Sequence, residues 1–447
     1  MNTVDHLHDA DDEHWVRLTQ AEALTNLRTV LELCAAGEVK CSGKTGRPSA
    51  ATIRAVGTHL ANGDFYTGEP IASFAWPLLI QAGGLAKLEG TRLQPTTKGH
   101  AALGKPPAEV IRHLWQRWLT HATIDEFSRI ENIKGQRCRN VLTAAKTRRQ
   151  LVDEALTGCP PGEWIDLASL FSKMRRGNTS PTIARNEMAL WKLYLVDPQY
   201  GSLGYAGYHN WEILEGRYIM AVLFEYTGTL GLVDLDYIQS AGAREDFRDN
   251  WGSDDLDALS RYDGLRSIRL NELGAYALGL TDTYQPEPVD SDATDAAPLK
   301  VLANLDIVAI GDLPAADRLL LTAYAKQTAD RVWTVSTTSL LSAIDSGRRL
   351  SDFTTFLTAH TTREVSALNT LMADVRRRAG QLADLGHSRL IECADPATAA
   401  LIAGDRRLRP LCRPIGDTHL AVPLDRELKF RNALLKLGYV VPGQAMT

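Results

Sequence analysis

The chain has 447 residues, of which 44% are hydrophobic and 23% are charged, and its formal net charge is −5. These values are ordinary for a globular protein, and the length predicts about two to four domains. They exclude a chain that is basic throughout, so any binding to nucleic acid must come from local patches.

The chain starts with an acidic, polar stretch rather than a signal peptide, and no apolar run approaches the roughly eighteen residues that cross a membrane. We therefore expect a cytoplasmic protein without a membrane partner. His6, His8 and His14 lie in the polar stretch, but a terminus without defined geometry is not a metal site. The six cysteines include no C-x-x-C pair, which argues against zinc ribbons and disulfide frameworks. We expect no metal and no other cofactor.

Residues 76–103 have the pattern of a winged helix. A helix passes through Gly83 and Gly84 into a strand, Glu89 and Gly90 form a turn, a second strand returns, and a short capped helix closes the unit. The same order recurs at residues 221–279. The two copies align at four positions, Gly99, Ala102, Leu103 and Gly104 with Gly274, Ala277, Leu278 and Gly279. We predict winged-helix-like units at residues 1–104 and 105–284, the second with an acidic insertion at residues 236–266.

The helices that would enter a DNA groove in these units are poor in basic residues. Residues 71–81 contain no lysine or arginine, and residues 217–226 contain only Arg217. A helix in the major groove needs several donors for bases and phosphates. We therefore interpret both as core or protein-interface helices.

The densest basic run lies between Arg129 and Arg149 and includes a single acid, Glu131. Its seven cations are Arg129, Lys134, Arg137, Arg139, Lys146, Arg148 and Arg149. A smaller cluster contains Lys44, Arg47 and Arg54, and a third contains Arg376, Arg377 and Arg378. The first two clusters are the candidate nucleic-acid-binding residues, because such cations neutralise backbone phosphates. The alternative is a solvated charged surface.

Aromatic and acidic residues accompany the basic run. Trp115, Trp118 and Phe127 could stack on bases, although their helical spacing also fits a core. Residues 234–263 contain nine acids and three basic residues, which would repel nucleic acid. This acidic segment could instead dock a basic surface of a partner protein.

Three segments imitate enzyme motifs without the required context. Lys44 and Thr45 resemble the end of a phosphate loop, but Gly37 stands one residue too far upstream and a helical pattern precedes it. Residues 151–154 resemble a Walker B pair but read as a solvated helix. Asp417, Glu427 and Lys429 resemble a nuclease core, yet the apolar spacing predicts a helix where a strand is needed. We expect no enzymatic activity.

Residues 285–298 contain three prolines, four acids and no basic residue, which is typical of a flexible linker. Beyond it, residues 302–310 are predicted to form a strand, and a helix follows that starts at Pro314. Residues 331–335 form the next expected strand, and residues 337–347 form a capped helix that ends on Gly347. A further helix carries Phe353 and Phe356.

This order of elements resembles the helicase-associated domain that precedes the motor of XPB-type DNA helicases. The residues that carry the resemblance are Ser339, Leu340, Ala343, Gly347, Leu368, Leu371, Asp374 and Val375. After Arg378 we expect a small α/β module, with strands at residues 389–393 and 418–422 and helices at 397–403 and 426–437. Residues 299–447 would together form the helicase-associated C-terminal region.

These patterns predict an α+β, helix-rich protein with two winged-helix-like units and a helicase-associated C-terminal region. The resemblance implies binding to DNA or to a helicase. We therefore expect a non-catalytic bacterial accessory protein of DNA transactions, in repair or defence, whose partners are DNA and a helicase or another protein subunit. Two alternatives remain, a scaffold subunit of a multiprotein complex and a winged-helix transcription regulator.

Overall fold

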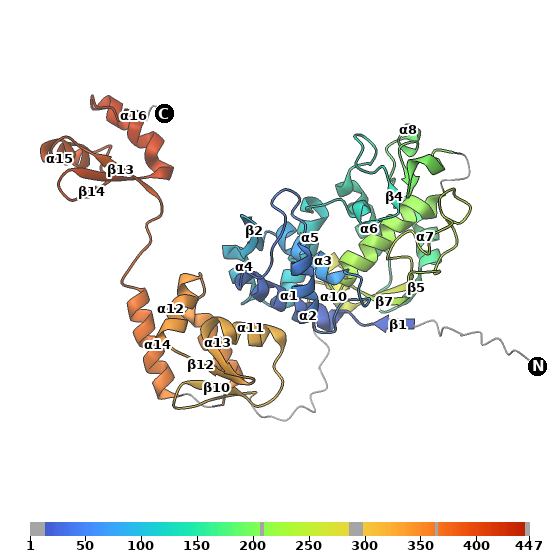
Figure 1. The fold of residues 1–447 in the computed structure, drawn as a ribbon, viewed down its shortest axis with the longest axis horizontal. Helices are drawn as coiled ribbons and strands as arrows, with labels where there is room; N and C mark the ends of the chain where they lie inside the picture. Colours follow the sequence, from blue (N-terminus) through green and yellow to red (C-terminus); the bar gives the residue numbers. More distant parts are fainter. Residues whose placement is uncertain (1–13, 206–209, 286–297, 363–364, 443–447) are drawn as a thin grey trace, which may run out of the picture. The chain divides into compact units, whose positions relative to one another are not determined.

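Helices and small antiparallel sheets alternate along the chain (Figure 1). The structure is a computed structural model that describes residues 14–205, 210–285, 298–362 and 365–442. About 45% of the chain is helical and 15% is in strands, which confirms the expected α+β class. The chain divides into two compact units at residues 375 and 376. In the described residues, no helix is both long and apolar enough to cross a membrane.

The first helices precede a hairpin, as the sequence predicts. The helices are α1 (Gln20–Ala35), α2 (Ala50–His59) and α3 (Ala72–Ala82). The hairpin pairs β2 (Ala86–Glu89) with β3 (Arg92–Pro95), and α4 (Thr97–Ala102) and α5 (Pro107–His121) follow. Gly90 makes the turn at a φ of +64°, which only glycine adopts without strain. Lys40, between α1 and α2, forms an isolated bridge with Arg92 of β3.

The next elements again lead from helices to an antiparallel strand pair and a short helix. They are α6 (Ala145–Thr157), β5 (Trp164–Asp166), α7 (Leu167–Arg176) and one continuous helix built from η3 (Glu212–Gly216), α9 (Arg217–Ala221) and η4 (Val222–Gly228). Strands β7 (Val233–Ile238) and β8 (Leu265–Leu270) and helix α10 (Glu272–Leu278) follow. With β1 (His14–Arg17) the strands form a sheet in the order β1-β7-β8-β5.

One aligned pair of glycines, Gly99 and Gly274, lies in equivalent environments in the two copies. The backbone N–H of Gly99 is capped by Thr96 and that of Gly274 by Asn271. A Cβ on Gly99 would lie 2.0 Å from the carbonyl oxygen of Leu85, and one on Gly274 would lie 2.0 Å from that of Leu232. The internal repeat seen in the sequence therefore corresponds to a repeated close approach of helix and hairpin.

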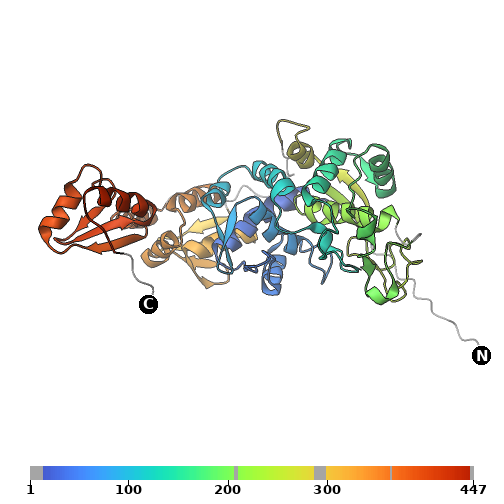
Figure 2. The same cartoon turned by 90° about the horizontal axis from the view of Figure 1, so that it is seen from above.

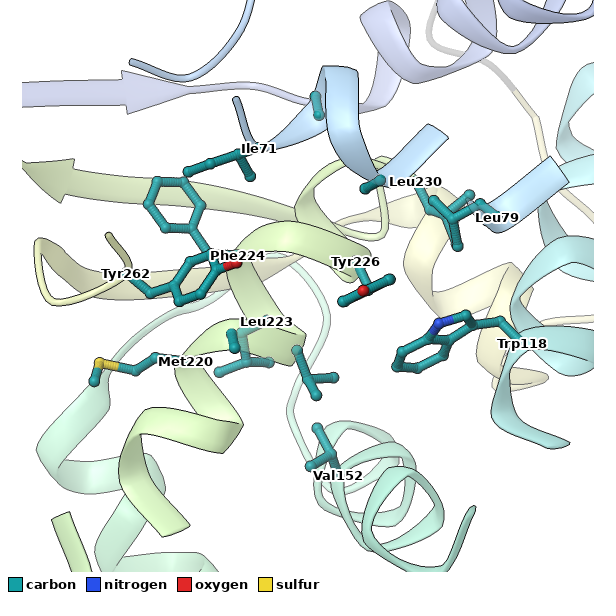
Figure 3. Packing of buried hydrophobic residues seen from close by; sticks show 14 of the residues in the cluster. Ile71, Leu79, Trp118, Val152, Met220, Leu223, Phe224, Tyr226, Leu230 and Tyr262 are labelled. Carbon is teal, nitrogen blue, oxygen red and sulfur yellow. The ribbon is translucent and has the colours of Figure 1, made fainter. Parts of the chain in front are cut away.

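The two segments that would enter a DNA groove in winged-helix units are both core helices. Ten of the eleven residues of α3 are buried, and so is every residue from 213 to 228. Figure 3 shows Phe224, Tyr226 and Tyr262 inside the cluster, with Trp118 beside Tyr226. The rings of Trp118 and Tyr226 are stacked with centroids 4.6 Å apart. The interpretation of these helices as core is confirmed.

Residues 298–375 have a separate core. The strands are β9 (Leu299–Val301), β10 (Asp306–Ala309), β11 (Lys326–Ala329) and β12 (Val332–Thr334). The helices are α11 (Ala315–Tyr324), α12 (Thr337–Asp345), α13 (Leu350–His360) and α14 (Ser366–Ala379). The predicted capped helix is confirmed as α12, where Ser336 and Ser339 form a capping box and Gly347 has a φ of +89°.

The prediction of one strand over residues 302–310 is wrong. Leu305 has a φ of +70° and Asn304 donates to the carboxylate of Asp306, so this stretch turns and pairs β9 with β10 as a hairpin. Strand β11 was not predicted. All four of its residues are exposed, so it lacks the apolar alternation that identifies a strand. The sheet order is β11-β12-β10-β9.

Residues 376–447 form the second unit, drawn in red in Figure 2. Its sheet has the order β13 (Ser388–Glu392), β15 (His419–Pro423), β14 (Arg413–Ile415), and its helices are α15 (Pro396–Gly404) and α16 (Glu427–Lys436). The two predicted strands and two predicted helices are confirmed, and β14 is an addition. Glu427 and Lys429 lie on α16 rather than on a strand, as expected. Most of the predicted linker, residues 286–297, lies outside the described residues.

Candidate nucleic-acid interface

Three of the predicted phosphate-binding arginines lie inside the protein. Arg129 donates from Nε to both carboxylate oxygens of Glu225, at 3.0 and 2.9 Å. Arg149 donates to Glu126 at 2.9 Å, and Arg148, which is 1% exposed, pairs with Asp125. Arg129 thus joins the segment after α5 to the buried helix of residues 213–228, and Arg148 and Arg149 join α6 to Asp125 and Glu126, so the positions of the three arginines do not fit the expectation that they contact phosphates.

Burial and opposite charges determine how these buried groups ionise. Burial raises the pKa of Glu126 to about 7, although the Arg149 cation acts to lower it. Burial also raises the pKa of Glu225, although the Arg129 cation acts to lower it. Burial alone would lower the pKa of Arg129, but the Glu225 carboxylate raises it above its ordinary value. Arg129 therefore remains a cation whose charge is balanced inside the protein.

The other predicted cations are at or near the surface. Six of them are exposed, namely Lys134, Arg137, Arg139, Lys146, Lys44 and Arg54. Arg47 is partly buried. Arg47 donates from Nη2 to the Ser128 hydroxyl at 2.5 Å. Burial and the cations of Arg129 and Arg137 lower the pKa of Arg47. The fold thus brings Arg47, from the smaller sequence cluster, beside the larger one, whereas Arg54 lies on α2.

A pocket of about 320 Å³ lies beside these residues. Its lining includes the cations Arg137 and Arg185 and the polar side chains of Ser128, Gln136, Asn140 and Thr143. Asp125 also lines it, but this carboxylate is paired with Arg148. We call this the basic pocket. Its two guanidinium groups and its hydroxyl and amide groups are the kind of donors that bind a phosphate.

Backbone pairing explains how Arg185 reaches the basic pocket. The N–H of Arg185 donates to the carbonyl of Val141 at 2.8 Å, and Leu142 bridges Ala184. Next to this pair, β4 (Ile133–Lys134) pairs with β6 (Tyr194–Leu195). Gly135 has a φ of +84°, and a Cβ there would lie 1.7 Å from the carbonyl oxygen of Lys192. Glycine therefore lets the two segments approach closely.

Lys192 joins the surface from the same segment. Its ammonium group donates to the carbonyl of Arg139 at 3.4 Å. Residues 134–146 contain no acid, and residues 182–205 contain two, Glu187 and Asp197. We define the basic face as Arg47, Lys134, Arg137, Arg139, Arg185 and Lys192. Arg185 and Lys192 were missed in the sequence because each is an isolated cation there, and only pairing with residues 134–142 brings them to the others.

The aromatic residues expected near the basic run belong to the core. Trp115, Trp118 and Phe127 are at most 1% exposed, which confirms the core alternative. Other rings are exposed instead, namely Trp191 at 48%, Tyr200 at 41% and Tyr205 at 51%. They follow α8 (Glu187–Leu190), in the segment that supplies Lys192. The sequence signal that could have identified them is an aromatic series in a turn-rich stretch without helical spacing.

The acidic insertion is partly tied to the interior. Arg217 is fully buried and pairs with Asp263 at 3.1 Å and also with Asp246. Asp234 accepts from Arg269 and from the backbone of Thr19. The exposed carboxylates of the insertion include those of Asp254, Asp255 and Asp257. The insertion therefore contributes buried ion pairs and a residual acidic surface.

The turn that resembles a phosphate loop has a different setting. Helix α1 precedes it, and residues 42–47 form a tight turn in which the N–H of Gly46 donates to the carbonyl of Ser42 at 2.8 Å. A phosphate loop leaves a strand and opens a helix. Helix α2 starts only at Ala50, where Ser49 caps it. Lys44 is thus a surface cation of a turn between Cys41 and Pro48, which form a bridge.

A comparison with protein-family models found no match, and a comparison with curated proteins found none either. The functional argument therefore depends on the residues and geometry of the chain.

Proposed function

We propose that this protein is a non-catalytic DNA-binding accessory protein of DNA transactions, and that the basic face binds the phosphate backbone. One observation carries the proposal. In a chain with a net charge of −5, separate segments place Arg137 and Arg185 in one pocket, and Arg47 donates to the hydroxyl of Ser128, which lines the same pocket. Local positive charge of this kind binds backbone phosphates without reading bases.

The fold supports the same proposal. The order of a winged helix fits α1, the bridge at Lys40, α2, α3 and the hairpin of β2 and β3. The same order fits α6, β5, α7, the continuous helix and the strand pair β7 and β8. We propose that both are winged-helix-like units and that residues 299–447 are related to the helicase-associated domain of XPB-type helicases. On this proposal a helicase is a second partner, and the setting is the cytoplasm of a bacterium, in repair or defence.

The buried helices favour binding to any DNA sequence. A winged-helix transcription regulator would need a helix exposed to the groove, but α3 and residues 213–228 are buried. The scaffold alternative is favoured by one observation, the exposed carboxylates of Asp254, Asp255 and Asp257, which could meet a basic partner. Binding to DNA by the purified protein separates the two functions.

The test is a triple variant, Arg137→Ala with Arg139→Ala and Arg185→Ala, measured by fluorescence anisotropy over a salt series. It should weaken binding to all sequences alike. Each lost phosphate contact should lower the magnitude of the log–log salt slope by about 0.9 for duplex or about 0.7 for single strands. The matched control removes three exposed arginines of the second unit, Arg406, Arg407 and Arg409.

The control changes the net charge by the same amount but removes no residue of the basic face, so it should leave the salt slope unchanged. Equal losses in both triple variants would reject the basic face. Changing Asp254, Asp255 and Asp257 to Asn should strengthen binding or leave it as it is. We do not include Arg148 and Arg149 in the test, because removing a buried cation would destabilise the fold and obscure any effect on DNA.

The non-catalytic part of the proposal has its own measurement. Purified protein should not hydrolyse ATP, with or without DNA, because Lys44 lies in a turn after a helix. A steady ATPase rate that Lys44→Ala abolishes would overturn this part and leave the DNA-binding part standing.

A further inference from the structure

We infer that the DNA held at the basic face is single-stranded, with bases stacking on Trp191 and on the tyrosines near it; this inference rests on the proposed function. The starting observation is the combination of cations with exposed rings. Lys192 follows Trp191 directly and contacts the backbone of Arg139. Positive charge that follows the backbone, together with aromatic faces that accept bases, is the general pattern of single-strand binding.

Trp191 is held in place although it is 48% exposed. The backbone of Gly204 lies against the indole, since a Cβ on that glycine would be 2.5 Å from indole Cδ2. The ring of Tyr205 meets the indole edge, with centroids 4.9 Å apart and planes at 72°. Ser202 ties this turn down by donating to the carbonyl of Leu190 at 3.0 Å. A ring already held in one position loses little entropy when a base stacks on it.

A second pair of rings joins this segment to the acidic insertion, because Tyr200 lies between Trp191 and Tyr205 and Trp251 lies in the insertion. Tyr200 is 41% exposed and Trp251 is 68% exposed. A Cβ on Gly252 would lie 2.9 Å from Tyr200 Cδ2, so the backbone beside Trp251 rests against the tyrosine ring. Exposed rings at several neighbouring positions are unusual on a protein that binds nothing there. They give separate places for bases along one strand.

The structure disfavours a duplex at this face. Bases in a duplex are stacked on one another and are not available to side chains. Reading the bases of a duplex requires a helix or ribbon in a groove, but α3 and residues 213–228 are buried, so a duplex would contact this face through its phosphates alone. Between Trp191 and Tyr205 the only acid is Asp197, and Glu187 precedes them, whereas Trp251 lies close in sequence to the exposed Asp254 and Asp255. Asp197 caps the N–H of Gln199, and Glu187 is exposed on α8.

The test compares an oligothymidine strand with a duplex of equal length, using anisotropy and the full chain. A strand of about 16 nucleotides covers one site of this kind. We expect tighter binding to the single strand. Trp191→Ala should weaken single-strand binding about 5- to 150-fold, as expected for the loss of one stacked base. It should leave the salt slope unchanged, because no charge is removed.

Two further variants exclude a folding defect. Trp191→Phe keeps an aromatic face and should retain most of the affinity. Trp164→Ala removes a tryptophan that is 40% exposed on β5 and should change nothing. Equal or tighter binding to the duplex, with no effect of Trp191→Ala, would overturn the single-strand inference. In that case, weaker DNA binding by the triple arginine variant would still support the proposed function. Tighter binding to an RNA strand of the same length would also overturn it. If no nucleic acid binds, both proposals fail.

Discussion

Arg348 Nη1 lies 2.7 Å from Glu32 Oε2, and both side chains are buried although 316 positions separate them in sequence. The pair connects α1 to the loop that precedes α13. Arg28 and Asp317 form a second link at 2.9 Å between α1 and α11, where His360 also lies 3.4 Å from the Asp317 carboxylate. Charged contacts thus join the first helix of the chain to residues 298–375.

Removing one member of the buried pair should be costly. Arg348→Ala leaves the Glu32 carboxylate buried and unpaired, so we expect a loss of about 3–5 kcal/mol in the free energy of unfolding. Urea denaturation measures it. Arg349→Ala is the matched control, because that neighbouring arginine is exposed, and its effect should stay within about 0.5 kcal/mol. Equal effects of the two substitutions would contradict the assigned pair.

The repeated glycines make a second prediction. Gly99→Ala and Gly274→Ala should each lower stability by about 1–3 kcal/mol or more, because the new methyl group would collide with a backbone carbonyl 2.0 Å away. Gly57→Ala is the control, since its Cβ would meet Ser73 Cβ at an ordinary 3.6 Å within α2. That control should be neutral or stabilise by up to about 1 kcal/mol. Thermal denaturation of the three variants gives the comparison, and a stabilised Gly274→Ala protein would refute the repeat geometry.

Glu215 should make stability depend on pH. Burial raises its pKa to about 7, although the hydrogen bond from the backbone N–H of Ile183 and the Arg148 cation act to lower it. The folded state therefore holds this proton more tightly than the unfolded state, whose pKa is near the ordinary value of 4.5. The resulting stability is present below about pH 4.5 and is lost as the pH rises towards about 7.

The change across this pH window should be on the order of 3 kcal/mol, at 1.36 kcal/mol for each pKa unit. Glu215→Gln removes the titration, so its unfolding free energy should fall less than that of the parent protein over the same range. The exposed Glu163 supplies the control, as Glu163→Gln should follow the parent curve. Parallel curves for the parent protein and Glu215→Gln would show that Glu215 does not titrate there.

The boundary between the two compact units should be open to proteolysis. Leu382 is 88% exposed and Leu385 is 63% exposed, between the end of α14 at Ala379 and the start of β13 at Ser388. Thermolysin should cut at these leucines and release a C-terminal fragment that keeps its own core. Changing both leucines to Asp should protect the site without altering the urea midpoint. The predicted linker at residues 285–298 should be a separate early cut, and first cleavage inside a core would contradict both boundaries.

The sequence by itself determined those features that depend on neighbours along the chain. The hairpin at Gly90, the capped helix α12 and the elements β13, β15, α15 and α16 were predicted because turn residues, caps and apolar periodicity act over a few positions. The match between Gly99 and Gly274 was also visible. The stretch around Leu305 was misassigned because a positive φ at leucine has no sequence signal.

Only the tertiary structure decided which cations reach solvent. Arg129 and Arg137 look alike in the sequence, yet Arg129 pairs with Glu225, which lies 96 positions away, and Arg137 lines the basic pocket. Local patterns cannot identify such a partner, because a carboxylate distant in sequence must first be buried beside the arginine. The same reason applies to Arg185 and Trp191, whose positions depend on backbone pairing and loop contacts that form only when the chain has folded.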